Sequence, residues 1–166
     1  AFTEQVQSLV EGGVDLLVVE TQFDLAEAQT ALRAVRTITD LPLVCSFSFD
    51  RGTRTMMGVR PQQVAALVED LDVDMVGINC GQGLEQNLVA LQELRVSTKL
   101  PLWFKPNAGL PSTDEQDRTI YTIIPQAMAG HVKEWLAVGV NVVGGCCGTT
   151  PDHLAMIRSE ITSLIS

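Results

Sequence analysis

Short apolar runs of strand length alternate with segments of helical periodicity along the whole 166-residue chain. Residues 14–20, 73–79 and 140–145 resemble one another: each has a turn with Gly or Asp before an apolar run. Their spacing fits two strand–helix units of roughly 30 residues each. This alternation predicts a parallel α/β sheet, and the apolar character of the runs predicts strands that are buried on both faces.

The expected elements can be placed by residue number. Strands are predicted at 15–21, 43–49, 74–79, 102–105 and 141–145, and helices at 2–12, 25–38, 61–70, 84–96, 125–138 and 151–164. The polar connection 106–122 has a length typical of functional loops. Five parallel (β/α) units suit either an open doubly wound sheet or part of a TIM-type (β/α)8 barrel. A GxGxxG pattern does not follow the first strand, which weakens a dinucleotide-binding interpretation.

Composition narrows the class of protein. The chain is 46% hydrophobic, which suits one globular domain with a sizeable core. A net charge of −9 without a basic cluster argues against binding to nucleic acid or to an anionic membrane. The apolar runs are too short to cross a bilayer, and residues 1–7 do not resemble a signal peptide. A cytoplasmic location is therefore expected, where four cysteines favour metal or catalytic use over disulfides.

Two adjacent cysteines, Cys146 and Cys147, follow the last predicted strand. Thr150 can cap the helix after them. Neighbouring residues of a regular strand point to opposite faces, so the backbone must leave strand geometry for both thiols to reach one ligand. The flanking glycines permit this. Three interpretations compete: two buried inert cysteines, a strained vicinal disulfide, and a pair of metal ligands.

A third thiol is predicted to lie on the same rim, because the carboxyl ends of parallel strands meet at one edge. Cys80 follows the third strand, whereas Cys45 lies within the second strand and is expected in the core. His131 and His153 are expected to be surface or packing residues. Three thiolates suit zinc, and three protein ligands leave the open position that is typical of a catalytic site.

Zinc with three thiolates is electron-rich and would keep a bound thiol substrate deprotonated for attack on an activated methyl group. Other rim residues are candidates for binding an amino-acid thiol. Glu20 can accept from an ammonium group or be a solvated carboxylate, and Asn107 can bind substrate, fill the open zinc position or shape a turn. Ser46 is a weaker candidate, and we expect Asn79 to point away from the metal.

The residues that carry this chemistry resemble those of the homocysteine S-methyltransferase family. The matching segments are Glu20-Thr21, Asp50-Arg-Gly-Thr, Gly-Ile-Asn-Cys80, Pro-Asn107-Ala-Gly and Gly-Gly-Cys146-Cys147-Gly-Thr-Thr-Pro. They most resemble the homocysteine-binding domain of cobalamin-dependent methionine synthases. The resemblance implies a (β/α)8 barrel that binds Zn²⁺ through Cys80, Cys146 and Cys147, with Glu20 near the homocysteine amino group and Asn107 beside the metal.

The same resemblance implies that residues 1–166 form a partial barrel domain, namely strands four to eight. A complete barrel of this class needs about 250 residues. The first strands and any folate- or cobalamin-binding modules would come from elsewhere, with methylcobalamin, bound by another domain or chain, as the expected methyl donor. Betaine or S-methylmethionine are alternative donors. A non-catalytic zinc- or thiol-binding fragment and a redox role for Cys146–Cys147 are the other hypotheses. Two unpaired sheet edges would favour homo-oligomers.

Overall fold

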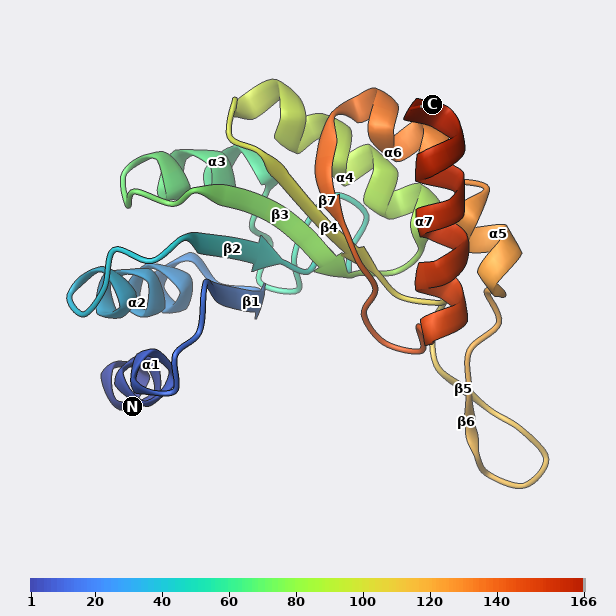
Figure 1. The fold of residues 1–166 in the computed structure, drawn as a ribbon, viewed down its shortest axis with the longest axis horizontal. Coiled ribbons are helices and arrows are strands. Elements are labelled where there is room, and N and C mark those ends of the chain that lie inside the picture. The colour runs from blue at the N-terminus through green and yellow to red at the C-terminus, as the bar shows by residue number, and fades with distance from the viewer. Residues whose placement is uncertain (166) are drawn as a thin grey trace.

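Five parallel strands form one curved sheet in the order β1-β2-β3-β4-β7 (Figure 1). They are β1 (Leu17–Gln22), β2 (Leu43–Phe47), β3 (Met75–Cys80), β4 (Leu102–Pro106) and β7 (Val140–Val143). The computed structural model describes residues 1–165. Every neighbouring pair in this sheet runs parallel. All five carboxyl ends therefore reach the same edge, as the alternating sequence pattern predicts.

Each strand of the sheet is followed by helical structure. The helices are α1 (Phe2–Glu11), α2 (Leu25–Arg36), α3 (Pro61–Glu69), α4 (Leu84–Ser97), α5 (Pro125–Ala129), α6 (Val132–Val138) and α7 (Pro151–Ile165). The Asp24 carboxylate caps α2 by accepting from the backbone N–H groups of Ala26 and Glu27. Pro61 opens α3, where its missing N–H has no helical partner to lose. The predicted class of parallel (β/α) units is confirmed.

The two faces of the sheet carry different side chains. Those directed toward the helices are apolar and fully buried in the three central strands, for example Cys45, Phe47, Val76, Ile78 and Phe104. Alternate positions face the inner, concave side and become polar toward the carboxyl ends, as at Glu20, Ser46, Asn79 and Lys105. All of β2 is buried, but β1 and β7 are mostly half-buried. The prediction of burial on both faces therefore holds for β2 and most of β3. It is wrong for the edge strands and for the inner face of β4, where Trp103 and Lys105 are half-buried.

Two elements differ from the prediction. The helix expected at 125–138 is divided into α5 and α6 at Gly130 and His131. The long connection after β4 contains a small antiparallel hairpin, β5 (Ser112–Thr113) and β6 (Thr119–Ile120), which projects from the rest of the chain (Figure 1). Within residues 1–165, none of the helices has the length and apolar character that a membrane crossing requires.

Candidate metal centre

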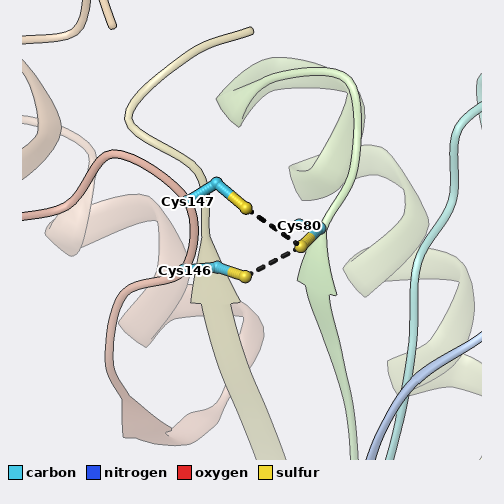
Figure 2. A group of neighbouring side chains, drawn as sticks. All are labelled: Cys80, Cys146 and Cys147. Atoms are coloured by element: carbon cyan, nitrogen blue, oxygen red, sulfur yellow. Dashed lines mark hydrogen bonds between the residues drawn. The ribbon is translucent and has the colours of Figure 1, made fainter. Parts of the chain in front are cut away.

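Three cysteine sulfurs meet at the carboxyl edge of the sheet. Cys80 ends β3, whereas Cys146 and Cys147 lie in the loop between β7 and α7 (Figure 2). The Cys80 Sγ atom lies 2.8 Å from Cys146 Sγ and 3.9 Å from Cys147 Sγ. All three sulfurs lie within 4.8 Å of one another. The structure thus brings together the three cysteines that the sequence places on one rim, and Cys147 is exposed to solvent.

Backbone hydrogen bonds to the end of β4 fix the loop that carries Cys146 and Cys147. The Cys146 N–H donates to the Pro106 carbonyl, and the Ala108 N–H donates to the Cys147 carbonyl, both at 2.9 Å. The loop then turns at Gly148, whose φ is +76°. A Cβ atom there would lie 2.1 Å from the Tyr121 ring, so only glycine fits. The backbone therefore leaves strand geometry here, as two convergent thiols require.

Cys80 itself adopts a left-handed backbone conformation, with φ of +57°. For a residue with a side chain this conformation costs about 1 to 2 kcal/mol. The Asn87 amide stabilises the turn by donating to the Cys80 carbonyl at 2.7 Å. Strained residues of this kind persist only where the surrounding structure holds them in place, and they are concentrated at functional sites. Here the left-handed conformation turns the Cys80 sulfur out of the strand pattern and toward the opposite loop.

The prediction that Asn79 points away from the metal is wrong. Its Nδ2 lies 3.5 Å from Cys80 Sγ and 3.8 Å from Cys146 Sγ, within reach for a weak N–H···S hydrogen bond. The strand alternation on which the prediction depends ends at Cys80, where φ becomes positive. The Asn79 amide can therefore reach the sulfur cluster to which its neighbour in sequence, Cys80, contributes one sulfur.

Asn79 is also the centre of a buried network that the sequence did not indicate. Its Oδ1 accepts from the Ser46 hydroxyl at 2.6 Å and from the Thr21 N–H at 3.0 Å. Its Nδ2 also donates to Thr21 Oγ1 at 2.6 Å. Thr21 has φ of +60°, a conformation that is rare for a β-branched residue. One amide thus holds the strained end of β1 against β3.

Ser46 is fully buried on β2. Its hydroxyl donates to Asn79, so the structure gives Ser46 a supporting position. A direct contact between Ser46 and substrate stays a prediction.

Asn107 joins the two segments that carry the cysteines. Its Oδ1 accepts from the Cys147 N–H at 3.0 Å, and its Nδ2 donates to the Gly81 carbonyl at 3.2 Å. The side chain is largely buried. Asn107 therefore lies beside the sulfur cluster, with both ends of its amide engaged by backbone groups.

Glu20 forms an ion pair with Lys105, whose Nζ lies 2.6 Å from Glu20 Oε1. Both side chains are partly buried, with 34% and 25% of their surface exposed. The sequence indicated Glu20 as a candidate and gave no role to Lys105. The two residues are 85 positions apart, so no local pattern reveals the pair.

The remaining cysteine and both histidines lie outside the cluster. Cys45 is fully buried, which raises the pKa of its thiol to about 12. His131 contacts Glu134, and the buried His153 ring links Thr150 to the Ile123 carbonyl. The packing roles expected for Cys45 and His153 agree with these contacts. Among residues 1–165, no second group of His, Cys, Asp or Glu has metal-binding geometry.

The short distance between the Cys80 and Cys146 sulfurs shifts the pKa values of their two thiols in opposite directions. The hydrogen bond from Cys80, with a smaller contribution from the Asn79 amide, lowers the pKa of the Cys146 thiol to about 5. That same hydrogen bond, together with burial, raises the pKa of Cys80 far above its usual range. One thiolate is therefore formed readily, and the next is resisted by its negative neighbour. A cation in the cluster removes this penalty, because thiolates are the form that binds metal.

The sulfur positions fit a metal ion of the size of zinc. Two thiolates bound tetrahedrally at about 2.3 Å are about 3.8 Å apart. The 3.9 Å between Cys80 and Cys147 matches this value. The 2.8 Å between Cys80 and Cys146 is shorter, so these two sulfurs would separate by about 1 Å around the ion. Exposure of Cys147 leaves one side of the cluster open to a further ligand.

Two known proteins that this chain resembles in sequence or structure are a methionine synthase and a homocysteine methyltransferase. The chain is 32% identical to methionine synthase of Mycobacterium leprae over 170 residues, which cover 97% of this chain and 14% of that protein. The apo form of the homocysteine methyltransferase MmuM from Escherichia coli matches with a TM-score of 0.77 and 28% identity, over 96% of this chain and 56% of MmuM.

The metallated form of MmuM matches with a TM-score of 0.78 and 29% identity, over 95% of this chain and 50% of that one. The chain thus spans only a part of each relative, about a seventh of the methionine synthase and about half of MmuM. The profile of the homocysteine S-methyltransferase domain matches residues 1–161. This chain, with its parallel (β/α) units and its cluster of three cysteines, belongs to the homocysteine S-methyltransferase family.

Proposed function

We propose that this chain is part of a methyltransferase domain that binds zinc through Cys80, Cys146 and Cys147 and methylates homocysteine to methionine. The observation that carries the proposal is the convergence of three sulfurs within 4.8 Å. Bound zinc would lower the pKa of the substrate thiol, so that its thiolate is present at neutral pH. The substrate thiol has access from the side where Cys147 is exposed.

The other residues of the site bind and orient the substrate. Glu20 accepts hydrogen bonds from the homocysteine ammonium group, as its position near the carboxyl end of β1 permits. Asn107 holds the two cysteine-bearing segments together and lies beside the position of the substrate sulfur. Ser46 keeps the Asn79 amide directed toward the sulfurs.

Methylcobalamin is the methyl donor that we favour, in a methionine synthase type of reaction. The similarity to a methionine synthase supports this choice, because that protein is long enough to contain further modules. Betaine and S-methylmethionine remain alternative donors. A cytoplasmic setting would keep the three thiols reduced. The second candidate is a zinc- or thiol-binding role without catalysis, in which the chain contributes to assembly.

The zinc stoichiometry of cysteine variants tests the metal site. We expect Cys80→Ser and Cys147→Ser to lose most of the bound zinc, whereas Cys45→Ala, in the core, keeps it. Undiminished zinc in both serine variants would contradict the proposal. Zinc-edge absorption then separates the two candidate functions: homocysteine should add a sulfur ligand, and an unchanged spectrum would favour the non-catalytic role.

The methyl donor is identified by assays of methionine formation with the full-length protein. Methylcobalamin, betaine and S-methylmethionine are supplied separately with homocysteine, and Cys147→Ser is the matched inactive control. We expect methionine to form from homocysteine and methylcobalamin, and not when betaine or S-methylmethionine is the only donor. Turnover with only betaine or S-methylmethionine would replace the proposed donor and leave the zinc-thiolate proposal standing.

A further inference from the structure

The ion pair between Glu20 and Lys105 bridges the inner face of the sheet. Glu20 is on β1 and Lys105 is on β4, and β2 and β3 lie between them in the sheet order. The Lys105 Nζ also lies 5.9 Å from the centre of the Trp103 ring. The pair is therefore no contact between neighbouring strands. Two partly buried charges of opposite sign face each other across the concave surface.

Asn79 and its neighbours connect both charges to the sulfur cluster. Lys105 is the register partner of Asn79, whose amide reaches the sulfurs of Cys80 and Cys146. Glu20 precedes Thr21, which hydrogen-bonds to the same amide. The stem of Lys105 passes close to Gly144, where a Cβ would lie 3.0 Å from Lys105 Cγ. A small thiol bound at the sulfurs thus meets one fixed negative and one movable positive group.

We propose that Lys105 binds the α-carboxylate of the amino-acid thiol while Glu20 binds its ammonium group. This inference rests on the proposed function, because it concerns the substrate of the same site. A partly buried charge that loses its partner is costly. If an ammonium group alone displaced Lys105 from Glu20, the lysine would be left unpaired beside a second cation. A zwitterion avoids this, because it offers one opposite charge to each residue.

The proposal makes Lys105 a specificity-determining residue for α-amino-acid thiols. Its flexible stem allows Nζ to move from the carboxylate of Glu20 to that of the substrate. Without bound thiol, Lys105 balances the negative charge of Glu20. With the thiol bound, two ion pairs replace this one: Glu20 with the ammonium group and Lys105 with the carboxylate. Thiols that lack either charged group should leave one protein charge unpaired and bind more weakly.

Titration calorimetry on the zinc-loaded full-length protein tests this with three thiols. Homocysteine carries both charges, homocysteamine lacks the carboxylate, and γ-mercaptobutyrate lacks the amino group. We expect the wild-type protein to bind homocysteine about ten-fold or more tightly than homocysteamine, the size of a charge-assisted contact. Equal Kd values for these two thiols would overturn the proposal without any variant.

Variants separate the two halves of the pair. Lys105→Met should reduce the preference for homocysteine over homocysteamine to about two-fold or less, and Lys105→Arg should retain most of it. Glu20→Gln should instead reduce the preference over γ-mercaptobutyrate. Zinc content is measured for each variant as a control for the intact site. A Lys105→Met protein that keeps the preference, or that binds homocysteine more tightly, would overturn the assignment.

Failure of this inference can be told from failure of the proposed function. If homocysteine adds no sulfur ligand to zinc in the wild-type protein, the proposed function fails. If the ligand is added but the preference does not depend on Lys105, only the role of Lys105 is wrong.

Discussion

The side chain of Asn79 connects three strands and two cysteines through one amide. It accepts from Ser46 and Thr21 and donates to Thr21, and it reaches the sulfurs of Cys80 and Cys146. All of this takes place in a fully buried position. The orientation of the sulfurs and the strained end of β1 therefore depend on the same residue.

Replacing Asn79 by alanine should destabilise the protein by about 2 to 4 kcal/mol, because buried donors at Ser46 and Thr21 lose their acceptor. Urea unfolding monitored by circular dichroism measures this change. Gln126→Ala, at an exposed position of α5, is the control and should change stability by less than about 0.5 kcal/mol. Equal stability of Asn79→Ala and wild type would show that water replaces the amide.

Zinc affinity should increase with pH because the raised pKa of Cys80 keeps that thiol protonated in the metal-free protein. Cys146, with its pKa of about 5, is already a thiolate near neutrality. Zinc bound by Cys80 would have to displace its proton, so the affinity for zinc should rise up to about ten-fold per pH unit for each proton released. Competition with a chelator between about pH 6 and about pH 8 measures the slope. An affinity for zinc that is independent of pH would mean that Cys80 releases no proton when zinc binds.

At the scale of single residues, the sequence identified the three cysteines because their position after strands is readable along the chain. The partners of these cysteines were not readable. Asn79 meets Thr21 across 58 positions, and Lys105 meets Glu20 across 85. Such contacts depend on sheet register and on positive φ values at Thr21 and Cys80, neither of which leaves a local pattern.

At the scale of elements, the turn between β7 and α7 determines the positions of Cys146 and Cys147. Gly148→Ala should destabilise the protein and weaken zinc binding, because the new Cβ would meet the Tyr121 ring at 2.1 Å. Gly58→Ala is a matched control: its φ is +82°, and nothing lies within 4 Å of its Cβ position. Only the backbone cost of about 1 kcal/mol is expected there. Thermal unfolding and zinc titration of both variants measure the difference, and equal effects would exclude the steric explanation.

The order and type of the main elements could be predicted because each strand and helix has its own period. The break between α5 and α6 could not, since buried Met128, Val132 and Trp135 continue one helical spacing across it. The hairpin of β5 and β6 was also missed. Its strands have two residues each, and Asp114, which accepts from the N–H groups of Gln116 and Arg118, organises the turn between them.

At the scale of the whole molecule, the sheet has two open edges. Within residues 1–165, the outer sides of β1 and β7 have no strand partner. Unpaired edges of this kind promote association between chains. The isolated 166-residue chain is therefore expected to self-associate or to unfold easily. Sedimentation and thermal melting over a range of concentrations test this, and a monodisperse monomer of high thermal stability would contradict it.

The distance along the chain between Cys80 and Cys146 has a consequence for unfolding. Their sulfurs are 2.8 Å apart in space but 66 residues apart in sequence. An ion bound by both cysteines would act as a cross-link between them. It would close a loop and so lower the conformational entropy of the unfolded chain. For a loop of this length the cross-link is worth about 4 kcal/mol. Calorimetric melting with zinc and with a chelator should then show a higher Tm for the metal-bound chain. An ion that activated a thiol in this site would also restrain the unfolded chain.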